Sequence, residues 1–143
     1  MLEVIALDLE GTLISNAVSQ IPRPGLYDFL EGCIFLTDRV VMYTTVKEDR
    51  FRNIANLLAS DGLAPEWFTS IEYVNWEGKT KDLGYIPDSI VDECVLVDDF
   101  HIYVHPGQEK QWAEIKQFDH TYPDNDYELK EMLTILRERK SSV

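Results

Sequence analysis

The sequence predicts an α/β fold, in which one doubly wound parallel sheet has helices on both faces, in a three-layer arrangement. Short apolar runs alternate along the chain with longer amphipathic segments, which is typical of βαβ units. The apolar runs are nearly continuous, as expected for strands that are covered on both faces. With 143 residues and no repeat, linker or low-complexity tract, the chain is expected to form a single domain, 1–143.

Five strands are expected in this sheet. They are the apolar segments 4–8, 39–45, 70–75, 93–99 and 114–118.

Three helices are expected at 23–32, 47–63 and 125–140. In the segment 47–63 one face is apolar, made by Phe51, Ile54, Leu57 and Leu58. The segment 125–140 begins with acidic residues and ends with basic ones, which suits the helix dipole.

The composition is strongly acidic. Asp and Glu number 26 against 13 Lys and Arg, so the formal net charge is −13. This charge argues against broad electrostatic binding to nucleic acid or to an anionic membrane. A site for anions would need a local positive charge, which a bound divalent cation can supply.

The two cysteines, Cys33 and Cys94, lack the spacing of a zinc site and lie in apolar stretches. We interpret them as reduced, buried thiols. The sequence shows neither a signal peptide pattern nor an apolar run of about 20 residues. These features together predict a cytoplasmic location.

Acidic residues stand where two of the expected strands end. Asp8 ends the first apolar run and Glu10 follows it, while Asp98 and Asp99 end the run at 93–99. In open parallel sheets ligands bind outside the carboxyl ends of the strands, so these carboxylates should converge. Unpaired carboxylates repel one another, and Mg²⁺ is the hard cation that takes such oxygen ligands together with a substrate phosphate.

Four motifs in order resemble those of the haloacid dehalogenase-like (HAD) phosphohydrolases. The stretch "DLEGTL" resembles the signature D-x-D-G-T-[LV] of that superfamily, and "VVMYT" resembles its second motif. The stretch "KTKDL" resembles the segment that supplies its lysine, and "VLVDD" its closing acidic pair. The stretches "RPGLYDFLEG", "KDLGYIPDSIVDECVLVDD" and "IKQFDHTYPDNDYELKEMLTIL" are similar to the small NLI-interacting-factor-like (C-terminal-domain phosphatase-like) group.

The resemblance implies a Rossmann-like fold and a catalytic role for two acids. Asp8 would be the nucleophile that forms an aspartyl-phosphate, and Glu10 would be the general acid and base. Mg²⁺ would be held by Asp8, the backbone carbonyl of Glu10, Asp98 and Asp99, with Asp99 a ligand through water or an orienting partner. Glu10 departs from the usual Asp by one methylene, as in the enolase-phosphatases, which leaves rate and substrate range open.

The resemblance also implies a hydroxyl and a lysine that bind the phosphoryl group. Thr44 is the first polar residue at the strand edge, and Thr45 is the alternative. Lys81 precedes Asp-Leu as in the family pattern, and Lys79 is the alternative.

No cap domain fits between the motifs. The intervals from Asp8 to Thr44 and from Thr44 to Lys81 hold only a helix and a strand each with their connections. The open crevice suits a large phosphorylated substrate such as a phosphoprotein, or a homo-oligomer in which a neighbouring subunit excludes water. Alternatives are a small-metabolite or polynucleotide-end phosphatase and a non-catalytic phosphate-binding scaffold, while the order of the motifs disfavours a receiver-type regulator.

Two further groups have structural and functional interpretations. His101 and His105 are four residues apart, as a zinc pair on a helix would be, but the β-branched and aromatic residues between them disfavour a helix. His101 could instead contact substrate. The side chains of Trp67, Trp76 and Trp112 are expected to pack in the core or at its rim.

Overall fold

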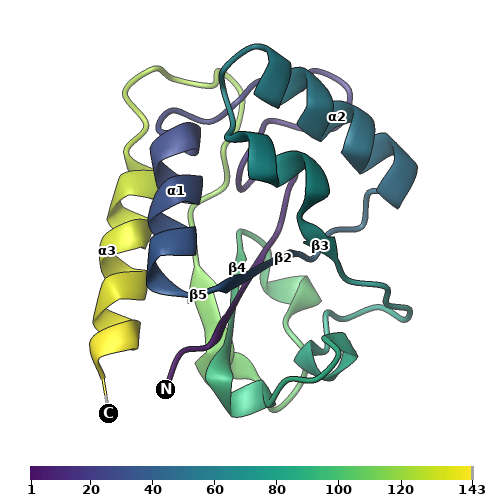
Figure 1. Cartoon of the computed structure of the whole chain (residues 1–143), viewed down its shortest axis with the longest axis vertical. Helices are drawn as coiled ribbons and strands as arrows, with labels where there is room; N and C mark the ends of the chain where they lie inside the picture. Colours follow the sequence, from purple (N-terminus) through teal and green to yellow (C-terminus); the bar gives the residue numbers. More distant parts are fainter. Residues whose placement is uncertain (143) are drawn as a thin grey trace.

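The computed structural model describes residues 1–142, which form a five-stranded sheet in which all neighbouring strands pair in parallel (Figure 1). The strand order is β3-β2-β1-β4-β5. The strands are β1 Val4–Leu7, β2 Arg39–Met42, β3 Glu72–Tyr73, β4 Cys94–Asp98 and β5 Trp112–Glu114. The expected α/β class with a doubly wound parallel sheet is confirmed.

The chain winds outward from β1 in two directions. It first adds β2 and β3 on one side of β1, and then returns to add β4 and β5 on the other side. Because crossovers between parallel strands are right-handed, the connections on the two sides must lie on opposite faces of the sheet. The direction of winding reverses between β1 and β4, so the switch point of the sheet lies at these two strands.

The α-helices of the described residues all pack on one face of the sheet. They are α1 Leu26–Leu36, α2 Glu48–Ser60 and α3 Glu128–Ser141. Their buried apolar side chains join one cluster with Ile5 and Leu7 of β1 and with Val95 and Val97 of β4. The helices α1 and α3 lie side by side at the left of Figure 1, and α2 lies above the sheet.

The opposite face of the sheet is covered by irregular chain and 3₁₀ turns instead of α-helices. Its cluster contains Val4 and Ala6 of β1, which are buried by Leu83 and Ile86 from the connection between β3 and β4. This connection contains two 3₁₀ turns, Leu83–Tyr85 and Val91–Glu93, and otherwise irregular chain. The three layers are therefore present, but the helices expected on both faces cover one face only. A helix is disfavoured here because Gly84 and Pro87 interrupt the segment.

Several boundaries differ from the sequence prediction. The last strand, expected at 114–118, is Trp112–Glu114, because Trp112 and Ala113 pair with Leu96 and Val97. The strand expected at 70–75 is the two-residue β3, and the helix expected at 23–32 is shifted to Leu26–Leu36. Gly25 precedes that helix with a φ of 83°, a left-handed conformation that glycine adopts without strain.

Two further expectations concern burial and helix charge. Cys33 and Cys94 are free and buried, and burial raises the pKa of both thiols. The helix α3 has Glu128 and Glu131 in its first turn and Arg139 in its last turn, as its dipole favours. Within residues 1–142, no helix combines the length and the apolar character that a membrane crossing requires.

Candidate active site

Two aspartates meet at the carboxyl ends of the neighbouring strands β1 and β4. Asp8 directly follows β1, and Asp98 is the last residue of β4. Leu7 lies opposite Val97 in the parallel ladder, and the Asp8 N–H donates to the Val97 carbonyl oxygen at 3.0 Å. The switch point of the sheet therefore carries two carboxylates, one from each strand, as expected for a ligand site.

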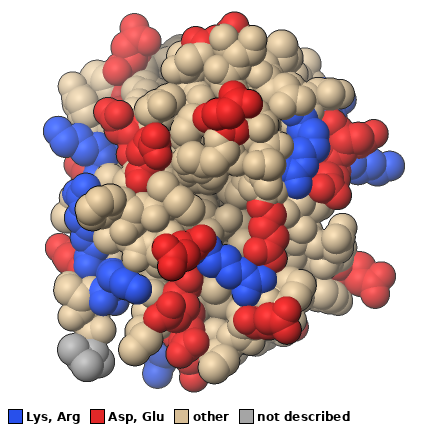
Figure 2. Space-filling model, viewed as in Figure 1, with Lys and Arg blue, Asp and Glu red and all other residues tan. Residues whose placement is uncertain are grey.

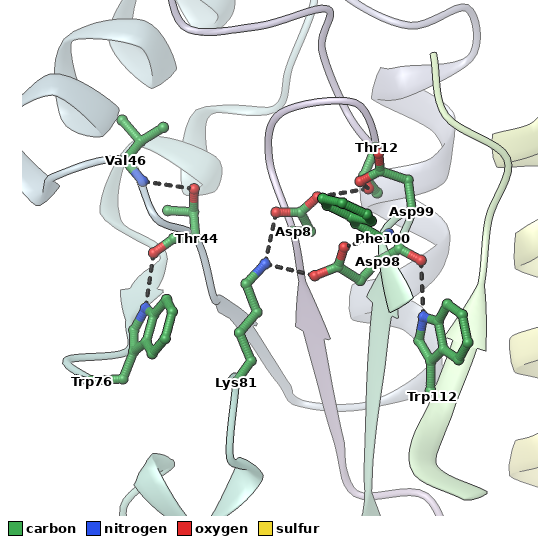
Figure 3. A network of polar contacts seen from close by, with 10 residues as sticks. All are labelled: Asp8, Thr12, Thr44, Val46, Trp76, Lys81, Asp98, Asp99, Phe100 and Trp112. Atoms are coloured by element: carbon green, nitrogen blue, oxygen red, sulfur yellow. Dashed lines mark hydrogen bonds and ion pairs between the residues drawn. The ribbon is translucent and has the colours of Figure 1, made fainter. Parts of the chain in front are cut away.

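A buried lysine joins these two aspartates (Figure 3). The Lys81 Nζ lies 2.8 Å from Asp8 Oδ1 and 2.6 Å from Asp98 Oδ2, and the lysine is almost fully buried. Its backbone N–H donates to the Tyr103 carbonyl oxygen at 2.7 Å, and its ammonium lies 4.9 Å from the centre of the Tyr103 ring. The irregular connection between β3 and β4 thus delivers a fixed positive charge to the strand ends.

The charges of this group shift one another's pKa values. Burial by itself would lower the pKa of Lys81, but the carboxylates of Asp8 and Asp98 outweigh it and raise the pKa. Burial, and next the charge of Asp8, raise the pKa of Asp98 to about 6 despite the ammonium of Lys81. Burial, the hydrogen bond to Asp8 and the charges of Asp8 and Asp98 raise the pKa of Asp99 to about 8. The site therefore holds more negative charge than one lysine neutralises.

The three aspartates can supply a ligand set for a metal ion. Asp8, Asp98 and Asp99 each offer one oxygen, and these oxygens lie within 4.8 Å of one another. Three carboxylates against one ammonium leave two negative charges, which one divalent cation cancels. Oxygen ligands of this kind suit Mg²⁺, so the residues present fit the expected ion.

A threonine that we did not single out in the sequence connects the carboxylates. The Thr12 Oγ1 lies 2.9 Å from Asp8 Oδ2 and 3.1 Å from Asp99 Oδ1, and the side chain is fully buried. One hydroxyl proton serves one acceptor at a time, so Thr12 orients both acids without satisfying both at once. Its position within "DLEGTL", at the turn after the strand, is the signal that could have found it.

Gly11 allows the turn to approach the acidic pair. Its φ is 76°, and a Cβ built there would lie 2.5 Å from Asp99 Oδ2. Any other residue would be strained by this φ and would displace the Asp99 carboxylate.

Glu10 is placed differently from the aspartates. Its Oε2 accepts a hydrogen bond of 2.7 Å from the Ala17 backbone N–H, and the side chain is half-buried. Its carboxylate is outside the group formed by the three aspartates, although Glu10 lines the same cleft as Asp8. The loop that follows the first motif therefore anchors this acid beside the three aspartates.

The two candidate threonines face different surroundings. Thr44 is buried, and its Oγ1 accepts from the Val46 N–H at 3.1 Å, which leaves its own hydroxyl proton free to donate to an anion. The Trp76 Nε1 donates to the Thr44 carbonyl oxygen at 2.9 Å and fixes this strand end. Thr45 is exposed and lines the cleft that contains Asp8.

The two candidate lysines also differ in burial. Lys81 reaches both aspartates, whereas Lys79 is exposed to solvent.

The cleft above Asp8 has a volume of about 320 Å³. Its acidic and hydroxyl side chains include Asp8, Glu10, Asp99 and Thr45. The rest of its lining is rich in aromatic side chains, namely Phe100, Tyr103, Phe118 and Tyr122. A second cavity of about 450 Å³ is lined by Thr44, Tyr73 and Trp76 among others. It shares Thr45 with the cleft above Asp8, but Asp8 is not part of its lining.

Arg23, which begins the stretch "RPGLYDFLEG", anchors the loop after β1, a role that the sequence pattern did not predict. Its guanidinium forms a forked pair with Asp126, with both N···O distances at 3.0 Å. It also donates to the backbone carbonyl oxygens of Gly11, Thr12 and Lys116 at 3.3, 3.2 and 2.6 Å. This fully buried arginine ties the turn that holds Thr12 to the segment before α3.

The histidines lie outside this group. His101 is exposed and begins a 3₁₀ turn, so the helical spacing that a zinc pair would need is absent between His101 and His105. The His105 Nδ1 lies 2.7 Å from Thr80 Oγ1, and its Nε2 lies 3.5 Å from Asp82 Oδ2. These contacts hold the segment that flanks Lys81.

The tryptophans lie against polar backbone and acidic groups. The Trp112 Nε1 donates to the Asp98 carbonyl oxygen at 3.0 Å, much as Trp76 does at Thr44. The Trp67 indole packs edge-on against Phe68 and donates to Glu31 at 3.3 Å. Two of the three tryptophans thus fix strand ends next to the site.

Comparison with known proteins agrees with this geometry. The sequence model of one family, described as NLI interacting factor-like phosphatase, matches residues 3–142. No curated protein sequence matches the chain.

Proposed function

Because the chain belongs to the NLI interacting factor-like phosphatase family, we propose that it hydrolyses phosphate monoesters through an aspartyl-phosphate on Asp8 and that it depends on Mg²⁺. The observation that carries the proposal is the buried Lys81 ammonium between Asp8 and Asp98 at the switch point of the sheet. A phosphoryl group bound there meets a carboxylate nucleophile and a fixed positive charge together. Phosphoryl transfer needs this combination of positioning and charge neutralisation more than it needs covalent chemistry.

Hydrogen bonds to both of its carboxylate oxygens orient Asp8 for attack on phosphorus. Oδ1 accepts from Lys81 and Oδ2 accepts from Thr12, so the side chain is held in one rotamer. One oxygen attacks phosphorus while the ester oxygen departs, and water then releases phosphate and restores the carboxylate. Lys81 stabilises the negative charge on the nucleophile and on the phosphoryl group during both steps.

The metal ion would be held by Asp8, Asp98 and Asp99, with the backbone carbonyl of Glu10 as the further expected ligand. When bound, Mg²⁺ would neutralise phosphoryl oxygens and align them with the nucleophile. Burial and the neighbouring carboxylate of Asp8 raise the pKa values of Asp98 and Asp99, and a bound cation would lower them.

Glu10 is the group that we assign to proton transfer. It lines the cleft above Asp8, and its contact with the Ala17 N–H fixes its position. It would donate a proton to the departing oxygen and later accept one from the attacking water. The hydroxyl proton of Thr44 would bind a phosphoryl oxygen, and Thr45 would contact the remainder of the substrate.

The open cleft supports a large substrate such as a phosphoprotein. A small phosphate ester is the alternative. A polynucleotide end is disfavoured because acidic side chains are distributed over the surface, with basic ones between them (Figure 2).

The test is the release of nitrophenol from para-nitrophenyl phosphate by the purified chain with Mg²⁺. We expect turnover by the wild-type protein and none by Asp8→Asn, which should keep the native circular dichroism spectrum. Removal of Mg²⁺ by a chelator should abolish the activity, and added Mg²⁺ should restore it.

Two other outcomes would contradict the proposal. A chain that binds beryllium fluoride but releases no nitrophenol would be a phosphate-binding scaffold. Activity that survives in Asp8→Asn would show that another group is the nucleophile.

A further inference from the structure

Given the proposed phosphatase activity, on which this inference rests, we infer that the preferred substrates are aryl phosphates, in which the phosphate is bonded directly to an aromatic ring. Phosphotyrosine is the biological form of this chemistry, and small phenolic phosphate esters share it. Three observations support the inference. They are the aromatic lining of the cleft, the placement of Glu10 and the charge around the cleft.

The cleft that contains Asp8 is lined by two pairs of aromatic side chains. Phe100 packs edge-on against Tyr103 with ring centres 5.7 Å apart, and Phe118 packs against Tyr122 at 5.2 Å. Phe118 is buried, whereas Phe100, Tyr103 and Tyr122 keep surface that a ligand can contact. The Tyr103 ring already faces the ammonium of Lys81, so Phe100 and Tyr122 are the rings that we assign to the ligand. A flat ring can stack on such faces or meet their edges.

Phe100 lines the same cleft as the proposed nucleophile Asp8. It is the residue after the acidic pair, and its backbone N–H donates to Asp98 Oδ1 at 2.9 Å. In the view of Figure 3 its ring lies in front of the carboxylates of Asp8 and Asp99. Because Phe100 and Asp8 line the same cleft, the ring is placed to contact the group bonded to the ester oxygen. A nucleotide would place its sugar there, and its base further away.

The exposure of Phe100 also needs an explanation. The side chain is 42% exposed although it adjoins a polar, buried site. An apolar ring that lines a cleft next to polar groups is the kind of surface that ligand sites use.

The anchoring of Glu10 favours a leaving group that needs little protonation. One of its oxygens accepts from the Ala17 N–H at 2.7 Å, so only the other oxygen remains to carry a proton to the departing oxygen. A phenol has a pKa of about 10, as in tyrosine. An aliphatic alcohol such as serine has a pKa closer to that of water, roughly 16. A phenolate therefore departs more readily than an alkoxide when proton donation is imperfect.

The charge around the cleft disfavours leaving groups that carry further negative charge. Glu10 and Asp119 line the cleft, and the formal charge of the whole chain is −13. An uncharged aromatic ring avoids this repulsion, whereas a second phosphate would meet it.

The reaction balances with water as the only co-reactant. An Asp8 oxygen forms a bond to phosphorus as the bond between phosphorus and the aryl oxygen breaks, and the electron pair leaves with the phenolate. The phenolate takes a proton from Glu10 or from water. Water then attacks the aspartyl-phosphate and loses a proton, which yields inorganic phosphate and the free Asp8 carboxylate.

The experiment compares kcat/KM for O-phospho-L-tyrosine and O-phospho-L-serine by the release of inorganic phosphate in the presence of Mg²⁺. We expect phosphotyrosine to be preferred at least about 30-fold. Equal values, or a preference for phosphoserine, would overturn the inference while leaving the phosphatase proposal intact.

Substitutions in the cleft separate ring contact from intrinsic reactivity. Phe100→Ala should lower kcat/KM for phosphotyrosine about tenfold, equivalent to about 1.4 kcal/mol, and change that for phosphoserine less than twofold. Tyr122→Leu provides a second test on the other aromatic pair and should act in the same direction. Phe35→Ala is the matched control, because Phe35 is 91% exposed on α1 and lines none of the cavities near Asp8. Equal losses on both substrates would overturn the inference.

The source of the aryl phosphate is distinguished by a pair of peptides that differ only in phosphotyrosine or phosphoserine. A kcat/KM for the phosphotyrosyl peptide that exceeds that for free phosphotyrosine would support a protein substrate. Equal values would support a small aryl phosphate.

A binding measurement distinguishes a failure of the hydrolysis proposal from a failure of the aromatic preference. Calorimetry with Asp8→Asn should show phosphotyrosine binding at least about tenfold tighter than phosphoserine binding. If the wild-type chain releases no phosphate from any substrate but this preference in binding is found, hydrolysis fails and the aromatic preference stands. No preference in binding, together with no preference in hydrolysis, would overturn the inference.

Discussion

The two faces of the sheet are built from different kinds of chain. One face is covered by α1, α2 and α3, whose buried leucines, phenylalanines and methionines form the larger apolar cluster. The other is covered by the connection between β3 and β4, with its 3₁₀ turns and irregular chain. Within residues 1–142, the irregular face contributes Lys81 to the ion pairs with Asp8 and Asp98, whereas the helical face contributes no charged side chain to them.

The difference shows that one face of the sheet mainly provides apolar packing, whereas the other face places a charged side chain at the site. A helix presents side chains at fixed spacing along a stripe, which suits close packing against a sheet. An irregular segment can direct one side chain inward at a chosen point, as Lys81 is directed between Asp8 and Asp98 by its backbone contact to Tyr103. Substitutions on the two faces should therefore have separable effects on activity and on stability.

The largest effect is expected when the irregular face loses its charge. Lys81→Met should lower kcat/KM for para-nitrophenyl phosphate by about 10²–10³-fold, because a preorganised charge next to the transferring group is removed. Lys79→Met is the matched control, since Lys79 is exposed, and should change the rate less than twofold. A Lys81→Met rate within tenfold of wild type would refute the role of this lysine.

A pair of matched leucines tests the comparison directly. Leu136 lies on α3 and Leu83 lies two residues after Lys81, and both are almost fully buried. Replacement of either by Ala should lower the free energy of unfolding in urea by about 2–5 kcal/mol. Leu83→Ala should also lower kcat/KM about tenfold by shifting Lys81, whereas Leu136→Ala should change it less than twofold. Equal losses of activity from both variants would show that the two faces do not differ in their contribution to catalysis.

Binding of Mg²⁺ by Asp98 and Asp99, at the carboxyl end of β4, should depend on pH. The pKa values of Asp98 and Asp99 are raised in the folded chain to about 6 and about 8, above the value of 3.8 for an ordinary Asp. Their protonation therefore stabilises the metal-free fold fully below about pH 4, and this stabilisation is lost as the pH rises towards 8. Since Mg²⁺ binds the ionised carboxylates, it should add more stability at pH 8.5 than at pH 6.

The measurement is thermal unfolding with and without Mg²⁺. At a Mg²⁺ concentration one hundred times its Kd, the stabilisation should be about 2.7 kcal/mol at pH 8.5. Asp99→Asn should reduce both the Mg²⁺ effect and its dependence on pH. A Mg²⁺ effect that is the same at both pH values would exclude these carboxylates as the ligands.

The smallest effect is expected at the solvent edge of the irregular face. Arg39 forms a forked pair with Glu72 across β2 and β3, with distances of 2.9 and 2.7 Å, and donates to the Asp88 carbonyl oxygen at 3.2 Å. Glu72→Gln should cost about 0.2–1 kcal/mol of unfolding free energy in urea, because both partners are exposed to solvent. Activity should be unchanged, and a loss above 2 kcal/mol would show that this edge supports the irregular segment.

Much of the fold follows from local sequence patterns. The first strand, the helix Glu48–Ser60 and the apolar run of β4 agree closely with the predicted segments, because periodicity and apolar runs are local properties. The segment 74–93 has no such period, and its arrangement follows from the strands that it must cover. The bounds of β5 depend on its pairing with β4, a contact that local sequence does not encode.

Within the site, the order of motifs points to Asp8, Lys81, Asp98 and Asp99, and the structure brings these four residues together. Other contacts were missed. Thr12 and Arg23 act through partners up to 103 residues away in the chain, and the anchoring of Glu10 by Ala17 depends on the course of a loop.

The sequence by itself determined the class of fold, the family and the acids at the ends of the strands, because these features are written in short contiguous patterns. Only the tertiary structure decided which lysine reaches the carboxylates, which face lacks helices and which aromatic side chains line the cleft. The physical reason is that strand pairing and burial bring distant segments within hydrogen-bonding distance, and such distances are properties of the packed chain.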